Sequence, residues 1–500
     1  MSVQMTDLVW EPYGSSKRIG ERLHLSAMSE PLHRWLLAAV VVCTAGCARH
    51  AAMPEPGGRV IVNYWEKWSG FEADSMQAVV DDFNHSQDRI EVRFLSVSGV
   101  DTKLLLATSS GHPPDVAGLW SENIPDFSEK GALTPLDRGL AKAGIGADRY
   151  IPLFWDLCRH RGFTWGLPTT PGCVALFYNK KLFRAAGLDP ERPPRTFGEF
   201  ESMSRRLTLV EIERANRRVH VSFEDLTPAE REGRKYSLVQ VGHLPQDAGM
   251  FLSGWGAWFG ARFYDGDRRI VANDDGNLAA YEWMRRTAEI YGVENLRGFI
   301  EGFGVAQSAQ TPFLGGAEAM VVQGPWMPNF ISKFAPGLEW GAAACPPADG
   351  VGGGAPVTLA QCDVVVIPHG APHPREALEF ICYLQRQDVA EKLAKSQQKF
   401  TALREVSDGF LVGHPNPAIK LFMEISRSPG ARYVPRIPIW HEYDAELAVA
   451  RERVLNLRMT PAEALAEVQS RVEWKFDRVM RRWDIVGNER LSEWRAYDAW

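Results

Sequence analysis

Residues 59–120 alternate between two kinds of segment, and this alternation constrains the fold more than any other feature. Runs rich in β-branched and aromatic residues at 59–65, 90–97 and 115–120 have the composition of buried strands. Between them, at 71–85 and 102–110, apolar residues recur with the period of a helix. Strands that alternate with helices in this way predict an α/β unit with a largely parallel sheet.

The rest of the chain continues the mixture, with no fixed-period repeat of the kind that marks a solenoid or a propeller. We expect strands at 163–168, 174–178, 319–323 and 357–368. We expect helices at 196–206, 276–291, 374–398 and 460–482, and a short helical segment within 311–325. Segment 345–356 is a Pro/Gly-rich connector, and the charged segment 211–240 resists assignment.

Composition excludes several classes of protein. Charged residues make up 24% and hydrophobic residues 45% of the 500, which is typical of soluble globular chains of two to four domains. The formal net charge of −6 argues against a nucleic-acid binder, since phosphate backbones require a basic surface. The sequence contains no run of the ~18–20 uncharged apolar residues that span a membrane, so a multi-pass membrane protein is excluded.

The N-terminal region reads as a targeting segment. The apolar run 35–42 follows His33 and Arg34 and ends just before Cys43-Thr-Ala-Gly-Cys47. Small residues directly before a cysteine resemble a bacterial lipoprotein signal, in which Cys47 becomes the lipid-modified first residue. An ordinary cleaved signal is the alternative. Residues 1–46 are then an extension plus signal peptide, with Met28 as a candidate start, and 47–58 form a tether.

Catalytic and metal-binding signatures are scarce. The chain has no phosphate-binding GxxxxGK[ST] loop, no GxSxG nucleophile turn and no HExxH zinc motif. Asp265, Asp267, Asp274 and Asp275 miss the calcium-loop spacing and suit turns better. Five cysteines follow Cys47, and their odd number leaves at least one thiol free or intermolecular. We therefore predict no cofactor, no metal and no enzyme, although a glycosidase carboxylate pair remains open.

The 17 tryptophans are the most informative residues for function. A lone tryptophan is usually a core residue, but several here stand at strand ends beside polar groups. The short runs in which this occurs are Trp65-Glu66, Trp120-Ser121-Glu122 and Trp440-His441-Glu442. An indole face covers the C–H face of a sugar ring, while a neighbouring carboxylate or hydroxyl bonds the sugar hydroxyls.

Four segments resemble the extracellular solute-binding proteins of bacterial ABC importers, the group that includes maltose-binding and other carbohydrate-binding lipoproteins. They are 165–187 (WGLPTTPGCVALFYNKKLFRAAG), 313–326 (FLGGAEAMVVQGPW), 374–398 and 435–477. The resemblance implies a two-lobed α/β fold, the type II periplasmic-binding-protein fold, with discontinuous lobes and a hinge. Lobe one would be 59–172 plus 356–402, and lobe two 173–345 plus 403–500. Cys345 and Cys362, in different lobes, would be unpaired.

The resemblance also implies a function. A sugar or oligosaccharide would be held between the lobes, and closure would present it to the transmembrane subunits of an ABC permease. The protein would be a periplasmic or extracytoplasmic monomer, anchored to the membrane by lipid at Cys47, without nucleic acid. The ligand-binding residues mapped in this way are Glu66, Trp68, Trp120, Ser121, Glu122, Trp258, Gly260, Trp326, Trp440 and Glu442.

Three departures from the family pattern bear on the ligand. Gly172-Cys173 stands where relatives carry an acidic or polar residue, Ala261 replaces a glycine, and Ala360-Gln361-Cys362 replaces a Gly-Gly pair. The open alternatives are a binding protein for a polyol, a phosphorylated glycerol or a peptide, a secreted glycan-degrading enzyme, and a structural envelope lipoprotein.

Overall fold

The predicted alternation produces the central sheet of the computed structural model, which describes residues 58–245, 254–303 and 311–500. The sheet has the order β14-β13-β3-β1-β2, with β6 also paired to β13. Its strands are β1 (Val60–Glu66), β2 (Ile90–Ser96), β3 (Val116–Trp120), β6 (Gly166–Cys173), β13 (Val357–Val366) and β14 (Gly430–Arg432). β1 pairs in parallel with β2 and β3, which confirms the α/β prediction, whereas β13 runs antiparallel to β3 and β6.

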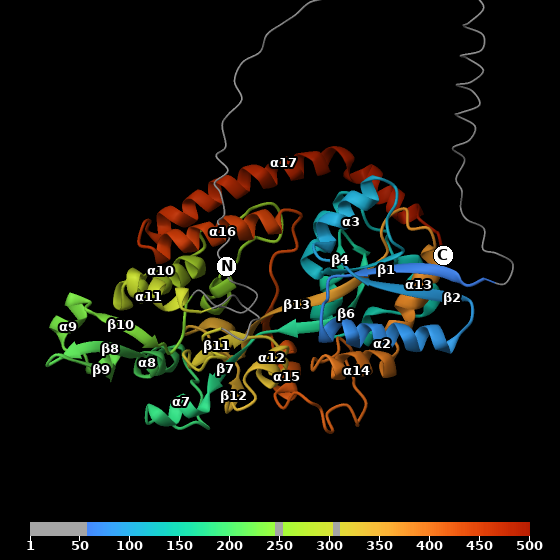
Figure 1. Cartoon of the computed structure of the whole chain (residues 1–500). Coiled ribbons are helices and arrows are strands. Elements are labelled where there is room, and N and C mark those ends of the chain that lie inside the picture. Colours follow the sequence, from blue (N-terminus) through green and yellow to red (C-terminus); the bar gives the residue numbers. More distant parts are fainter. Residues whose placement is uncertain (1–57, 246–253, 304–310) are drawn as a thin grey trace, which may run out of the picture. The chain divides into compact units, whose positions relative to one another are not determined.

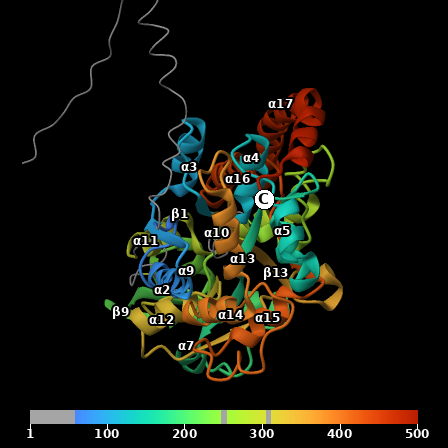
Figure 2. The same ribbon diagram turned by 90° about the vertical axis from the view of Figure 1, so that its right-hand side faces the viewer.

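Helices cover this sheet and complete a first hydrophobic core. α13 and α14 pack beside α2 (Figure 1, Figure 2), and Phe380 of α13 contacts Phe83 of α2 with ring centroids 5.2 Å apart. The helices and short strands of this part are α2 (Phe71–Ser86), α3 (Val100–Ser109), α4 (Ile124–Glu129), α5 (Asp137–Ala143), α6 (Pro152–Leu157), β4 (Arg159–His160), β5 (Phe163–Thr164), α13 (Pro374–Leu384), α14 (Gln387–Ser396) and α15 (Ile419–Ser426). The single helix expected at 374–398 is two helices, because Arg386 takes an extended backbone and starts α14.

A second hydrophobic core lies around a small antiparallel sheet of order β11-β7-β12. Trp255 and Trp283 meet at its centre with ring centroids 4.8 Å apart. Its elements are β7 (Ala175–Asn179), α7 (Lys180–Ala185), α8 (Phe197–Leu207), the 3-10 turn η4 (Gly254–Phe259), α10 (Asp275–Tyr291), β11 (Met320–Gln323), β12 (Trp340–Ala343) and α16 (Trp440–Leu455). The neighbouring helix α12 (Met327–Phe334) instead buries its apolar residues in the first core, and α11 (Val293–Glu301) buries its own in a third, smaller cluster.

The structure assigns one segment that the sequence analysis left open and corrects one local prediction. The charged segment 211–240 belongs to a three-stranded antiparallel sheet made by β8 (Leu209–Arg214), β9 (Arg217–Ser222) and β10 (Tyr236–Gln240), with α9 (Pro228–Gly233) between the last two strands. Ala215 and Asn216 both take positive φ and form the two-residue hairpin turn, a geometry usually signalled by glycine. The helical segment expected in 311–325 is wrong, because a turn closed at Gly316 (φ +74°) precedes β11.

β13 and α17 (Pro461–Ala496) each reach both cores. Val357 and Leu359 of β13 lie in the second core, whereas residues 360–366 face the first. α17 starts with a capping box, in which Thr460 Oγ1 accepts from the Glu463 backbone 3.2 Å away. It runs fourteen residues beyond the expected end at 482, toward α13 (Figure 1). None of the described helices is long and apolar enough to cross a bilayer.

The far end of α17 is held in the first core by an aromatic cluster. Trp494 packs edge-on against Trp165 and Phe163, with centroid distances of 4.7 and 5.5 Å. The near end buries Phe476 in the second core. The lobe boundaries given above stay a prediction. Within the range predicted for lobe two, α15 contacts β6 and β13 and packs in the first core rather than the second.

We expect Trp494→Ala to lower the free energy of unfolding by about 3 kcal/mol, because truncating a buried tryptophan loses burial and leaves a cavity. Trp474→Ala is the matched control on the same helix, since that side chain is 58% exposed and should cost less than about 0.5 kcal/mol. Urea unfolding followed by circular dichroism measures both. Equal midpoints for the two variants would contradict a bridging role for α17.

Candidate functional site

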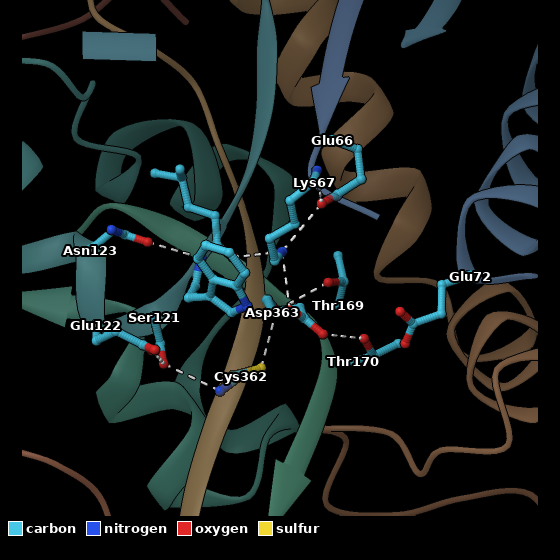
Figure 3. A network of polar contacts seen from close by, with 12 residues as sticks. Glu66, Lys67, Glu72, Ser121, Glu122, Asn123, Thr169, Thr170, Cys362 and Asp363 are labelled. Atoms are coloured by element: carbon cyan, nitrogen blue, oxygen red, sulfur yellow. Dashed lines mark hydrogen bonds and ion pairs between the residues drawn. The ribbon is translucent and has the colours of Figure 1, made fainter. Parts of the chain in front are cut away.

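Polar and aromatic side chains gather where β1 and β3 end. These strands are parallel, so their carboxyl ends meet at one edge of the sheet, and β13 places Asp363 directly opposite Trp120. Figure 3 shows part of the resulting group, which we call the strand-end cluster. Its members are Glu66, Lys67, Trp68, Glu72, Trp120, Ser121, Asn123, Thr170, Asp363 and Lys399.

A chain of buried charges forms the centre of the cluster. Lys67 Nζ lies 3.2 Å from Glu66 Oε1 and 3.0 Å from Asp363 Oδ1. Lys399 Nζ lies 3.4 Å from the other oxygen of Asp363 and 2.7 Å from Glu72 Oε1. One carboxylate therefore joins two ammonium groups that come from distant parts of the sequence.

Burial and ion pairing pull these ionisations in opposite directions. Burial by itself would raise the pKa of Asp363, but Lys67 and Lys399 outweigh it, and the net pKa lies below the usual value. Burial raises the pKa of Glu66, against the effects of Lys67 and of the Tyr64 hydroxyl that donates to it at 2.6 Å. Burial would lower the pKa of Lys67 and of Lys399, yet their carboxylate partners raise both. Asp363 and both lysines are therefore charged at neutral pH.

A β-bulge in β6 supplies the remaining bonds to Asp363. The pairing between β6 and β13 shifts register at this point, so Thr169 and Thr170 both face Asp363. Thr170 Oγ1 donates to the carboxylate at 2.9 Å, and Thr169 Oγ1 donates to the backbone carbonyl at 3.0 Å. The bulge fixes the carboxylate between the lysines.

Two indole rings flank the lysines. The ammonium of Lys67 lies 5.1 Å from the Trp68 ring centre and 5.4 Å from that of Trp120, within cation–π range. Lys399 also lies over Trp68, at 5.5 Å. Trp120 is only partly buried, so the cluster presents an aromatic surface beside fixed charges.

The turn after β3, η1 (Ser121–Asn123), ties the cluster to its surroundings. Ser121 Oγ accepts from the backbone N–H of Cys362 at 3.2 Å. Asn123 Nδ2 donates to His441 Nε2 on α16 at 2.9 Å, which links the cluster to an element of the second core. Glu122 lies between them, and burial raises its pKa despite the nearby His441.

The structure brings some of the ten expected ligand-binding residues together and leaves others apart. Glu66, Trp68, Trp120 and Ser121 belong to the strand-end cluster, and Glu122 adjoins it. The Trp326 ring lies against β6 at Gly172, where a Cβ atom would stand 3.0 Å from the ring. A side chain at position 172 would therefore crowd the Trp326 ring.

The other expected residues lie elsewhere. Trp258 is fully buried against Trp255, with ring centroids 5.3 Å apart. Trp440 packs on Phe263 and Tyr443 in the second core. Glu442 and Gly260 are exposed, the latter with φ +81°. Cys47 lies outside the described residues.

Sequence reasoning missed several members of the cluster: Lys67, Glu72, Asn123, Thr170, Asp363 and Lys399, together with the neighbouring His441. One signal was available, since Asp363 is the single charge in β13, a strand of ten buried residues. An ionisable group in such a strand requires a partner. Nothing local in the sequence indicated that Lys67 and Lys399 are its partners.

No three His, Cys, Asp or Glu side chains in the described part of the chain are grouped to hold a metal ion. Asp265 instead accepts the backbone N–H groups of a turn, those of Asp267, Arg268 and Arg269. Cysteines 158, 173, 345, 362 and 382 are all free, which confirms that Cys345 and Cys362 are unpaired.

Comparisons with known proteins agree with this architecture. The family model for the bacterial extracellular solute-binding protein matches residues 72–391. A putative binding protein of Brucella abortus is 24% identical over 346 residues, which cover 68% of this chain and 74% of that protein. A maltotriose-binding protein of Pyrococcus abyssi is 21% identical over 58% of this chain and 54% of its own length. An sn-glycerol-3-phosphate-binding periplasmic protein of Yersinia pestis is 24% identical over 53% of this chain and 66% of its own length.

Solved structures confirm the two-lobed fold. CpMnBP1 with mannotriose bound superposes with a TM-score of 0.70 at 24% identity, over 82% of this chain and 99% of that one. The sugar-binding protein MalE from Xanthomonas citri gives 0.66 at 21% identity, over 85% and 99%. The family match, which spans more than half of the sequence, and these folds lead to one conclusion: the chain belongs to the bacterial extracellular solute-binding protein family.

Proposed function

We propose that this protein captures a sugar or oligosaccharide at the strand-end cluster and delivers it to the permease of an ABC importer. The observation that carries the proposal is the partly buried Trp120 ring beside Trp68 and a set of fixed carboxylates and ammonium groups. Indole faces suit the apolar side of a pyranose, and charged groups bond its hydroxyls.

The balance of charge favours a neutral ligand over an anion. Each lysine of the cluster lies within 4 Å of two carboxylates, so neither ammonium group is left for an anionic ligand. A polyhydroxyl compound carries no net charge, and its hydroxyl groups can donate to the carboxylates without requiring a free ammonium group. The names of the maltotriose-binding relative and the mannotriose-bound structure support a carbohydrate.

Ligand capture would work through closure of the two lobes. The Asn123–His441 hydrogen bond joins the cluster to α16, and the Trp326 ring lies beside Gly172 of β6. A ligand that contacts both lobes only when they are closed shifts the population toward that form. The closed form would dock on the permease, with the protein acting as a monomer that binds without catalysis.

The lipid anchor at Cys47 would hold the protein in the cell envelope near its permease and raise its effective concentration there. We expect Cys47→Ala to move the protein from the membrane fraction to the soluble envelope fraction. Cys43→Ala is the matched control, four residues earlier in the same segment, and should leave the protein with the membrane. Membrane association of the Cys47→Ala variant would rule out this anchor.

Other solutes remain as alternatives to a sugar, notably a polyol, a peptide or a phosphorylated glycerol like that named for the Yersinia pestis relative. A secreted glycan-degrading enzyme is a further alternative. A thermal-shift screen of sugars, polyols, amino acids, peptides and glycerol phosphate separates the solutes, because a ligand at 100 times its Kd adds about 2.7 kcal/mol of stability. Product analysis of each stabilising glycan tests for turnover.

We expect Trp120→Ala to weaken binding of the sugar found by that screen by about 1–4 kcal/mol, because a stacking platform is lost. The fold should persist, since this ring is only partly buried. Trp474→Ala, an exposed tryptophan on α17, is the control and should bind as the unaltered chain does. Isothermal titration calorimetry measures all three. An unchanged affinity in Trp120→Ala would place the sugar elsewhere.

A further inference from the structure

A cavity elsewhere in the molecule, lined by no member of the strand-end cluster, has an unusual balance of charge. Its volume is about 710 Å³, within the range of small-molecule sites. Its walls come from segments 156–162, 261–266 and 431–438, together with Phe476 and Met480 of α17. No member of the strand-end cluster lines it.

Arginines dominate this cavity. Five of them line it, against a single carboxylate, Asp156; the five are Arg159, Arg161, Arg262, Arg432 and Arg436. Two have acidic partners: Arg161 lies 3.0 Å from Glu129, and Arg262 lies 3.8 Å from Asp274.

The other three arginines form no ion pair with any described carboxylate. Arg159 donates to the Gly162 carbonyl at 3.0 Å, and Arg436 donates to the carbonyls of Arg159 and Asp156. The Nε atoms of Arg159 and Arg432 are buried and meet no acceptor in the described part of the chain. Charged donors held this way are costly unless an anion joins them.

Aromatic side chains complete the walls. Phe263, Tyr264 and Tyr433 line the cavity, and the guanidinium of Arg436 lies 5.2 Å from the Tyr433 ring centre. Guanidinium forks match the paired oxygens of phosphate and sulfate groups, and the rings supply an apolar wall for the rest of a molecule.

We propose that this arginine-lined cavity is a second binding site, which takes a small organic molecule bearing a phosphate or sulfate group. Arg159, Arg432 and Arg436 line the cavity without a carboxylate partner among the described residues, and their guanidinium groups supply the charge that holds the oxyanion. The cavity has room for a molecule of monosaccharide size, and its ligand differs from the neutral solute of the strand-end cluster.

The position of the cavity allows binding of this second ligand to affect binding at the strand-end cluster. Arg159 directly follows Cys158 of the first core, whereas Phe263 and Phe476 belong to the second core. An anion that bridges these segments binds one arrangement of the lobes better than another. The two ligands then change each other's affinity by the same factor.

The test uses the purified full chain, with inorganic pyrophosphate and inorganic sulfate as probes in isothermal titration calorimetry at matched ionic strength. We expect saturable binding of at least one probe, and the stronger one identifies phosphate or sulfate chemistry. Arg432→Gln and Arg159→Gln should each weaken binding about tenfold or more, because each removes a charge-assisted donor. Arg217→Gln, an exposed arginine on β9, should have no effect.

Arg159 and Arg432 are substituted separately, and the thermal midpoint of each variant without probe confirms that it is folded. A loss of probe binding in a folded variant then does not reflect misfolding. The proposal fails if neither probe binds, or if folded Arg432→Gln and Arg159→Gln bind as tightly as the unaltered chain. It also fails if a sugar that saturates the strand-end cluster competes with the probe for one site. If the chain still binds one probe per molecule in the presence of that sugar, the result supports the proposal. This outcome does not depend on whether the sugar binds at the strand-end cluster.

Discussion

Two buried lysines share the carboxylate of Asp363, and the arrangement of the candidate site follows from this contact. Lys67 continues from the end of β1, Lys399 comes from the loop after α14, and Asp363 stands on β13 between β3 and β6. Each ammonium group needs the carboxylate, since an unpaired buried charge costs several kcal/mol. The contact therefore fixes three segments at once, and the Trp68 and Trp120 rings take their places around Lys67.

The same strand also connects the two halves of the fold. β13 begins in the second core and ends in the first, so Asp363 stands a few residues from the crossing between the lobes. α17 makes a second connection through Phe476 and Trp494. Movement of one lobe on the other must be accommodated by these links. A site beside the crossing strand and a charged cavity lined from both cores are both placed to sense such movement.

The fold was largely predictable because its signals are local. The alternating pattern of residues 59–120 gave β1, α2, β2, α3 and β3 within one or two residues. The hairpin of β8 and β9 was missed because its turn uses Ala215 and Asn216 rather than glycine, and the end of α17 was missed because its exposed residues hide the period. The break between α13 and α14 was also missed, since Arg386 is an ordinary helix former and the pattern of residues 374–398 gives no sign of it.

The site was only partly predictable, for a physical reason. The sequence could place Glu66, Trp120 and Ser121 near one another because they stand at the ends of strands, and parallel strands bring such residues together. Asp363 and Lys399 reach the same place through antiparallel pairing and a distant loop, which no local pattern encodes. Trp258 and Trp440 pack their rings against other aromatic side chains in the second core, which the sequence around them does not indicate.

The most direct test of the central contact compares Asp363→Asn with the unaltered chain in urea unfolding at pH 7 and pH 3. The native pKa of Asp363 is lowered, so its stabilisation is present above the unfolded pKa of about 3.9 and is lost as pH falls through the native pKa. We predict a loss of about 3–5 kcal/mol at pH 7, since two buried lysines lose a partner, and a smaller difference at pH 3. Equal stability at pH 7, or a difference that does not shrink in acid, would contradict the account.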